Sequence, residues 1–516
     1  MLTFKLISHD PSCYLHHRHR PLLVILMMLV LDVVLVNINV VDAFQQHHSS
    51  NVVGSFQRRT VDARTKNIKN KPLLLFPTSS SSPTKSKPKS STKLFVSATT
   101  NNNNLLSLDQ TSVRDVDSFI NWALNTCGVQ TVDGFYLGQQ DVDSNLDYFA
   151  TTSTGGTANS LILRVPSEMI LSSSQIQEEY SNYIPDACYQ VLREKDVLDK
   201  SYREFFLFLK LLMEYQNGMN SVYYPWLNSM PRKWNTAASF DYFCMSTLPP
   251  YIKGLANEKR DELKAFTTAL QNFEYINQDI KSNDEILKFI YNVVQTRSYL
   301  YGDDITDLRI APMVDYINHD YPANAEIRYD GNGNCEVYLT QDIPPNTPIT
   351  INYGSPTNPS KLLTKYGFLV NPGVTYCKLI IHNPSQKLID IGYSEENMVF
   401  NTVDGSISGI VWDVLLYDKL EKTAGMSQIK NKFYEAHCNN DVDTKNSIHA
   451  HYYNDTINEL LMHVDKILKE VTQLTQMMIQ FQNNERHPRL PLLYQHHNMV
   501  IQTFTLVRQQ LLAMMQ

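Results

Sequence analysis

The chain has 516 residues, a length that allows two to four domains with sizeable cores. Its formal net charge of -7 is uneven: residues 1–100 carry 13 Lys and Arg against 4 Asp and Glu, whereas the remainder carries 32 against 48. An acidic body argues against binding to a nucleic-acid backbone. The seven cysteines are scattered without a C-x-x-C pair, which disfavours zinc clusters and a disulfide framework and favours a reducing compartment.

The first hundred residues have the composition of a targeting segment. Arg18 and Arg20 precede an apolar run over residues 21–36, so residues 1–43 are predicted to be a signal peptide. The rival interpretation is a membrane anchor, but the run is near the lower limit for spanning and contains Asp32. We therefore expect no stable membrane association after the signal is removed.

Residues 44–103 differ in composition from the segment before them. They follow an Ala43-Phe44 junction, are rich in Ser, Thr, Asn and basic residues, and contain Asp62 as the only acid between residues 45 and 100. A signal peptide followed by such a segment resembles the bipartite presequences of algae with secondary plastids. The expected location is the plastid, and the alternative is a secreted protein with a basic linker.

The folded part is expected to begin near Leu105. Helical spacing of apolar residues predicts a short helix over residues 115–127, and β patterns predict strands at 134–137, 148–151 and 161–165. Residues 168–290 are predicted to be helical, with a buried helix at 202–215. A further helix, capped by Asn283 or Asp284, is expected to run through Arg297.

A central stretch gathers polar and aromatic residues at the ends of predicted strands. Residues 309–319 form an apolar-to-polar run that ends in Asn318-His319, and a strand at 349–352 leads into Tyr353. Between them, residues 325–329 and 336–339 alternate around a glycine-rich turn and predict a hairpin. Such positions allow a rigid scaffold to present side chains to a ligand.

Beyond Phe368 the sequence predicts a β patch at 376–381 and then helices, including 455–481 and a last helix from about 491 to 516. Four residues with metal-binding side chains occur here without a complete set of ligands: His437, Cys438, His496 and His497. They are expected to be solvated or packed in the core.

The central motifs resemble those of the SET-domain methyltransferases, in the branch that resembles the Rubisco large-subunit methyltransferase and includes the actin-histidine methyltransferase. The family pattern P-x-x-D-x-x-N-H, N-Y-G, a leucine pair and Y-G-F has its counterparts here in order. They are Pro312, Asp315, Asn318-His319, Asn352-Tyr353-Gly354, Leu362-Leu363 and Tyr366-Gly367-Phe368. The missing cysteine-rich zinc segment also favours this branch over the histone-directed SET enzymes.

This resemblance implies an α+β fold. A SET-domain β-fold over residues 104–370 would be split by a helical insert at about 168–290 and followed by an all-α substrate-binding domain over residues 371–516. It also implies S-adenosyl-L-methionine as the cofactor and protein N-methylation as the reaction.

The resemblance assigns roles to residues of this chain. Tyr353 would be the catalytic phenol that positions the acceptor nitrogen. The cofactor would be bound by six residues that surround it: Arg297, Asp315, Asn318, His319, Tyr366 and Phe368. For Arg297, the rival interpretation is a surface residue at a helix C-terminus.

One edge departs from the family pattern. Where relatives carry a G-x-G turn that lets the backbone approach the methyl donor, this chain has Asp147-Tyr148-Phe149. This departure favours one alternative, a non-catalytic peptide-binding protein with the same fold. A separate alternative is a secretory scaffold that matches the motifs by accident. The substrate implied by the resemblance is a plastid protein, such as the Rubisco large subunit or an aldolase, with lysine favoured over histidine.

Overall fold

This computed structural model describes residues 105–139, 148–301, 304–353, 358–370, 375–377, 381, 383–394, 397–481 and 487–516. The signal peptide and transit-like segment predicted over residues 1–103, together with Asp147, lie outside the described residues. The chain divides into Met1–Ser90 and Ser91–Gln516, and the described residues all belong to the second unit. Within the described part, no helix is long and apolar enough to span a membrane.

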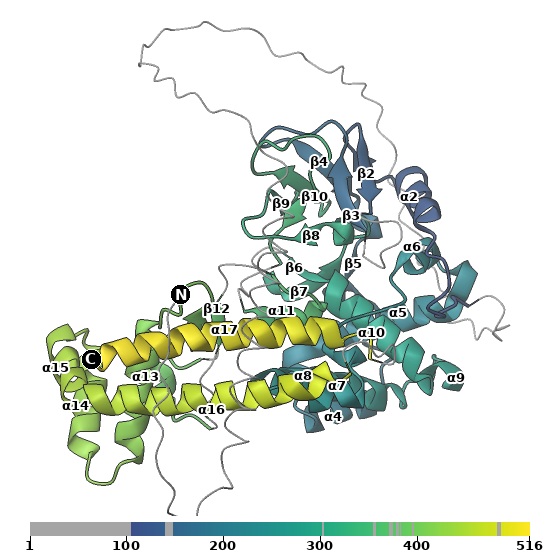
Figure 1. Ribbon diagram of the computed structural model, residues 1–516. Coiled ribbons are helices and arrows are strands. Elements are labelled where there is room, and N and C mark those ends of the chain that lie inside the picture. The colour runs from purple at the N-terminus through teal and green to yellow at the C-terminus, as the bar shows by residue number, and fades with distance from the viewer. Residues whose placement is uncertain are drawn as a thin grey trace, which may run out of the picture. The chain divides into compact units, whose positions relative to one another are not determined.

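A four-stranded sheet joins two segments that are far apart in the sequence (Figure 1). Its order is β1–β4–β10–β9, and all three pairings are antiparallel. The predicted hairpin is confirmed, because β9 and β10 pair directly on either side of Gly333, which adopts a φ of 81°. The strands are β1 (Gln130–Thr131), β4 (Leu161–Val165), β9 (Ala325–Tyr329) and β10 (Cys335–Leu339).

Smaller sheets complete the β part. The order β5–β7–β6 makes an antiparallel sheet, β2 pairs with β3, and β8 pairs with β11 in parallel. These strands are β2 (Phe135–Gly138), β3 (Phe149–Thr152), β5 (Leu171–Ser172), β6 (Tyr299–Tyr301), β7 (Asp304–Ile310), β8 (Asn318–His319) and β11 (Thr350–Ile351).

Helices occupy the chain between β5 and β6, and α2 (Val116–Asn125) precedes the first strand. Helix α5 matches the predicted buried helix, since Phe205, Phe206 and Leu209 are at most 1% exposed. Asn283 caps α10 through the N–H groups of Glu285 and Ile286, as predicted. The helices are α3 (Ser173–Tyr180), α4 (Asp186–Glu194), α5 (Leu198–Asn217), α6 (Tyr224–Ser229), α7 (Tyr242–Ser246), α8 (Pro250–Leu270), α9 (Gln278–Lys281) and α10 (Asp284–Arg297).

In the described part of the C-terminal region, the regular elements are helices and one short antiparallel pair of strands, β12 (Thr375–Cys377) and β13 (Val399–Asn401), so the region is not purely α-helical as predicted. Helices α16 and α17 lie side by side (Figure 1), and Met478, Leu490 and Leu493 from this pair share a core with α7, α8 and Leu363 of α11. The helices are α11 (Pro359–Tyr366), α12 (Gln386–Asp390), α13 (Gly409–Lys422), α14 (Ser427–Cys438), α15 (Val442–His451), α16 (Tyr453–Ile479) and α17 (Leu490–Met514). The α+β class is confirmed.

Two expectations about local structure need correction. The helical stretch starts at Ser173 rather than at 168, because residues 171–172 pair with β7 and leave Ser172 to cap α3. The strand predicted at 349–352 is confined to Thr350–Ile351, because its partner β8 is only two residues long.

Two interacting carboxyl groups lie in the helical region, the buried Glu262 and the partly buried Glu204. Glu262 accepts hydrogen bonds from Ser201, Tyr291 and Gln295, each at 2.8 Å. Burial and the charge of Glu262 raise the pKa of Glu204 on α5, and its Oε2 has no hydrogen-bond partner among the described residues. Because the folded-state pKa of Glu204 is raised, its contribution to stability is complete below the unfolded-state pKa and is lost as the pH rises through the folded-state pKa.

We therefore expect Glu204→Gln to increase the free energy of unfolding at pH 8 by about 1 kcal/mol and to have less effect near pH 4. Urea unfolding at both pH values measures this difference. Glu258→Gln, on the exposed face of α8, is the control and should have no comparable effect. A Glu204→Gln protein that is no more stable than the unmodified protein at pH 8 would show that Glu204 is well accommodated as an anion.

Candidate active site

The turn after β7 anchors the site. A short 3-10 turn at Val314–Tyr316 buries Asp315, which is 6% exposed, and leads into β8. The indole Nε1–H of Trp226 on α6 donates to Asp315 Oδ2 at 2.9 Å, and Arg297 Nη1 donates to the Asp315 carbonyl oxygen at 2.7 Å. This turn is thus held by two groups from the helical region.

Tyr353 is placed by the parallel pairing of β8 and β11, which sets Ile351 opposite His319. Its phenol donates to the carbonyl oxygen of Ile317 at 2.8 Å, and its backbone N–H donates to His319 Nδ1 at 3.2 Å. The phenol and the backbone N–H of Tyr353 are therefore both hydrogen-bonded to the segment that carries Asn318 and His319.

His319 must be neutral to make the second of these bonds. Its Nδ1 accepts from the Tyr353 N–H, so the proton of the neutral ring belongs on Nε2, although Nδ1 also lies 3.3 Å from the Ile351 carbonyl oxygen. Burial lowers the pKa of His319 below 6.5, which outweighs the opposing effects of the Ile351 carbonyl and Asp320.

A cavity of about 410 Å³ opens beside Tyr353. Four of the seven predicted site residues line it: Arg297, Asp315, Tyr353 and Tyr366. The guanidinium of Arg297 lies 5.9 Å from the ring centre of Trp234 and 5.3 Å from that of Tyr316, so the buried cation rests between two aromatic faces. This placement contradicts the alternative interpretation of Arg297 as a surface residue, since it is 7% exposed.

The other three predicted residues lie next to the cavity without lining it. His319 and Phe368 join Tyr353 and Tyr366 in a cluster of four rings, with centroid distances between 5.0 and 6.4 Å. Asn318 is exposed on β8.

Gly367 makes this aromatic cluster possible by ending α11 with a φ of 80°. A Cβ at this position would lie only 2.8 Å from the backbone of Asn235, so the turn from Tyr366 to Phe368 depends on glycine.

Two further tyrosines that the sequence did not single out line the cavity. Tyr299 on β6 and Tyr329 on β9 are partly buried beside the buried Cys335, and Tyr299 Oη lies 3.6 Å from Cys335 Sγ. Burial raises the pKa of both phenols far above the ordinary value, so they remain neutral hydrogen-bonding groups. Their signal in the sequence is weak: Tyr299 follows Arg297 by two residues, and Tyr329 ends a strand of alternating pattern.

The edge that departs from the family pattern carries aromatic side chains. The guanidinium carbon of Arg114 lies 5.0 Å from the centre of the Tyr148 ring. Phe149 begins β3 and pairs with Gly138 of β2. The expected glycine turn is thus replaced by a strand start whose side chains pack locally.

The four residues with metal-binding side chains lie in two helices: His437 and the exposed Cys438 in α14, and the buried His496 and His497 in α17. His496 Nε2 lies 2.9 Å from Ser360 Oγ, and His497 Nδ1 lies 3.1 Å from Thr475 Oγ1. Across the described residues, no group of three or more potential ligands is placed to hold a metal ion. The five cysteines whose side chains are described are unpaired thiols.

The pH dependence of stability should report on His319. Because its folded-state pKa is lowered, its contribution to stability is present above the ordinary value near 6.5 and is lost as the pH falls through the folded-state pKa. We expect His319→Asn, which keeps an acceptor but does not titrate, to lose less thermal stability than the unmodified protein between pH 7.5 and pH 5. The exposed His451→Asn is the control. Equal acid sensitivity of His319→Asn and the unmodified protein would exclude this role.

Comparisons with known proteins identify the region that contains the site. Residues 149–354 match the SET domain model, so this part of the chain is a SET domain. SET domain-containing protein 8 of Schizosaccharomyces pombe is 34% identical over 86 residues, which cover 16% of this chain and 20% of that protein. The chain thus matches only a fifth of the length of this curated relative.

Solved structures extend the likeness to most of the chain. The structure of Rubisco LSMT bound to AdoMet has a TM-score of 0.55 at 13% identity and covers 78% of this chain and 92% of that chain. The SET domain of LSMT bound to lysine and AdoHcy has a TM-score of 0.54 at 12% identity, with coverages of 77% and 91%. At such identities the likeness concerns the fold, and for the fold the resemblance to the LSMT-like branch is confirmed.

Proposed function

Because residues 149–354 form a SET domain, we propose that this protein is an S-adenosylmethionine-dependent protein N-methyltransferase with lysine as the favoured acceptor. One observation carries the proposal. The Tyr353 phenol donates a hydrogen bond to the Ile317 carbonyl oxygen, which fixes it at the wall of the cavity of about 410 Å³. Arg297 and Asp315 also line this cavity. A phenol held in this way can position an incoming nitrogen.

The side chains around Tyr353 have the chemical groups that binding of this cofactor requires. The four-ring cluster of His319, Tyr353, Tyr366 and Phe368 is partly exposed and offers aromatic faces for an adenine base, while Asn318 offers an amide to an amino-acid group. When bound, the cofactor supplies an electrophilic methyl group on a positively charged sulfur. The AdoMet and AdoHcy complexes of the similar LSMT structures support this assignment.

The residues of this chain favour a neutral acceptor nitrogen. Ile327, Ile351 and the uncharged phenols of Tyr299 and Tyr329 line one part of the cavity, and the charged residues on its wall are two cations, Arg297 and Lys365, and two carboxylates, Asp315 and Glu326. The apolar and phenolic part raises the cost of a charged ammonium, so a lysine side chain that enters it loses its proton to solvent more readily. Since the Tyr353 O–H already donates to Ile317, its oxygen lone pairs are available to accept an N–H of the acceptor and orient it.

The second candidate is a SET-fold protein that binds peptides without catalysis. The observation that favours it is the aromatic edge, where Tyr148 packs on Arg114 in place of a glycine turn. Titration calorimetry with S-adenosylmethionine separates the two functions. We expect measurable, weak binding that is reduced in Arg297→Leu. An absence of binding heat at millimolar cofactor would favour the non-catalytic function.

We further propose that the protein acts in the plastid, where the Rubisco large subunit and an aldolase are the candidate substrates. The sequence of residues 1–100, with its signal-like run and Ala43-Phe44 junction, supports this location. A fluorescent reporter fused to residues 1–100 should enter the plastid, and Phe44→Ala should hold it in an outer compartment. A cytosolic or secreted reporter would contradict the location without affecting the proposed reaction.

A further inference from the structure

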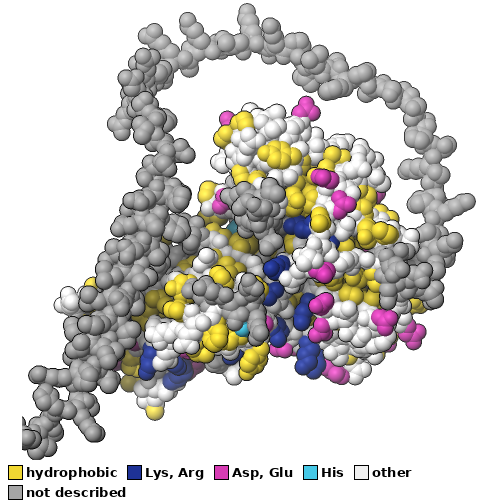
Figure 2. Space-filling model, turned by 45° about the vertical axis from the view of Figure 1, so that its right-hand side comes forward, with side chains coloured by type: hydrophobic (Ala, Val, Ile, Leu, Met, Phe, Trp, Pro, Cys, Tyr) yellow, Lys and Arg dark blue, Asp and Glu magenta, His cyan; other side chains and the backbone are white. Residues whose placement is uncertain are grey.

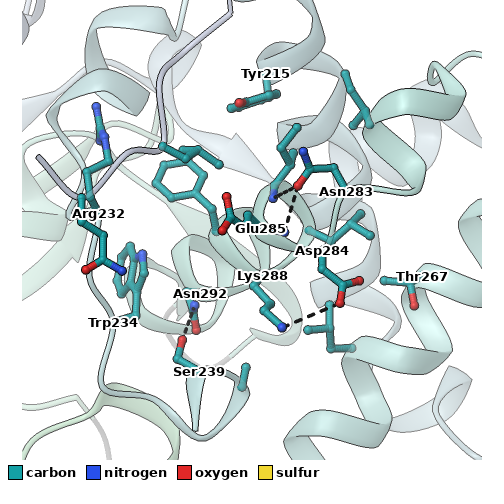
Figure 3. A pocket seen from close by; sticks show the side chains of 18 of the residues that line it. Tyr215, Arg232, Trp234, Ser239, Thr267, Asn283, Asp284, Glu285, Lys288 and Asn292 are labelled. Carbon is teal, nitrogen blue, oxygen red and sulfur yellow. Dashed lines mark hydrogen bonds and ion pairs between the residues drawn. The ribbon is translucent and has the colours of Figure 1, made fainter. Parts of the chain in front are cut away.

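Two segments of the chain connect the cavity beside Tyr353 to the N-terminal end of α17. The first contains Trp234, whose side chain also lines a larger cavity of about 1230 Å³ (Figure 3). Its ring centre lies 5.9 Å from the guanidinium of Arg297, which lines the cavity beside Tyr353. The next residue, Asn235, lies so close to Gly367 that a Cβ there would be 2.8 Å from the Asn235 backbone. Residues 234–235 therefore contact both Arg297 and the turn that ends α11.

The second segment is α11 itself, which brings Lys365 and Tyr366 to the wall of the cavity beside Tyr353. Ser360 is the second residue of this helix and lies about 9 Å from Tyr366 along the helix axis. The Asn358 side chain caps the helix and also donates to the Tyr251 hydroxyl at 3.0 Å. A short helix that is held at its first turn also fixes the position of its last turn, because backbone hydrogen bonds join the two.

The N-terminal end of α17 bonds to both segments. Arg489, the residue before the helix, donates its Nε–H to the Trp234 carbonyl oxygen at 2.8 Å. Two turns into the helix, His496 Nε2 lies 2.9 Å from Ser360 Oγ. One end of a C-terminal helix is therefore joined to the two segments that border the cavity.

The contact between His496 and Ser360 is internal. Hydrophobic, basic and acidic side chains all reach the face shown in Figure 2, whereas these two residues are both 0% exposed. Burial lowers the pKa of His496 to about 3, so its ring is neutral at ordinary pH and the contact does not depend on a charge. Leu490 and Leu493 of α17 share an apolar core with Leu363 of α11. The polar contact specifies one alignment of the two helices, because a shift would separate the hydroxyl from the ring nitrogen inside the protein.

We propose that Arg489 and His496 are positioning residues for cofactor binding at the candidate active site. Arg489 acts through Trp234, which supports Arg297, and His496 acts through α11, which carries Tyr366. Neither of the two residues lines the cavity beside Tyr353. The inference rests on the proposed function, because it is the cofactor that Arg297 and Tyr366 are expected to bind.

Titration calorimetry with S-adenosylmethionine tests the role of His496 in a matched pair of variants. His496→Leu removes the ring nitrogen that contacts Ser360. His497→Leu is the control, because His497 is equally buried in α17 but contacts Thr475 of α16. We expect His496→Leu to raise the Kd of the cofactor by about 3- to 30-fold and His497→Leu to raise it by less than about twofold. His496→Gln, which returns a polar group near the position of Nε2, should restore most of the affinity.

Arg489→Met tests the second contact. It removes the guanidinium and keeps an unbranched side chain, so the bond to the Trp234 carbonyl is lost. The control Lys469→Met removes one positive charge at an exposed position of α16. The expected increase in Kd is again about 3- to 30-fold, against less than about twofold in the control. Equal changes in each variant and its control would overturn the proposal.

Hydrogen exchange of the α11 amides gives a measurement that needs no cofactor. Ser360→Ala deletes the contact with His496 by removing a single hydroxyl, so the fold should be kept even if His496→Leu does not fold. We expect faster exchange at residues 362–367 in Ser360→Ala than in His497→Leu. Unchanged exchange in Ser360→Ala would overturn the role of His496. An unmodified protein that binds no S-adenosylmethionine would contradict the proposed function, and the exchange rates would still decide whether His496 holds α11.

Discussion

Replacing Tyr353 with Phe is expected to reduce methyl transfer by about 30- to 1000-fold, which corresponds to about 2–4 kcal/mol in the transition state. The change removes the one hydroxyl that bonds to the Ile317 carbonyl and faces the cavity, and it keeps the ring in its four-ring cluster. Loss of that hydrogen bond should cost only about 1 kcal/mol of folding stability. Single-turnover rates with saturating cofactor measure the effect on the reaction itself.

Asn318→Ala provides the contrast. Asn318 is exposed on β8 beside the ring cluster and does not line the cavity, so its loss should weaken cofactor binding before it changes the rate at saturation. Should Tyr353→Phe methylate its substrate at the unmodified rate, the phenol would have no role in the reaction, and the assignment of this site would be wrong.

Trp226→Phe is expected to lower the free energy of unfolding by about 1.5–3 kcal/mol. Trp226 is fully buried, and its indole N–H donates to Asp315 Oδ2, an acceptor on a side chain that is 6% exposed. Phenylalanine keeps most of the packing but leaves this carboxylate oxygen without its donor. Because Asp315 lies two residues before Ile317, which holds Tyr353, activity should fall as well.

Urea unfolding and single-turnover rates of methyl transfer on the same preparations measure both effects. Trp412→Phe is the matched control, because Trp412 is only partly buried in the C-terminal core and its indole makes no hydrogen bond to the described residues. Comparable stability losses in the two variants would mean that the bond to Asp315 contributes little beyond ring packing.

Local patterns in the sequence predicted much of the fold. The apolar face of 202–215 leads to α5 because its phenylalanines and leucines can be buried together, and the alternation around Asp330 leads to the β9–β10 hairpin. The Asn283 cap of α10 is equally local, since the side chain reaches N–H groups two and three residues ahead.

Contacts between distant segments were harder to predict. The two-residue parallel pair of β8 and β11 has no periodic signature, yet it brings Tyr353 to His319. Only the fold shows that the indole N–H of Trp226 reaches Asp315. Tyr299 and Tyr329 enter the cavity through the pairing of their strands with β7 and β10.

Transfer of a labelled methyl group tests the proposed reaction most directly. Purified protein would be incubated with methyl-labelled S-adenosylmethionine and a plastid protein extract, and the labelled residue would be mapped by mass spectrometry. We expect label on a lysine nitrogen of a plastid protein, with about 30-fold or greater loss in Tyr353→Phe. Cofactor binding without any labelled protein, or equal labelling by the two proteins, would contradict the account.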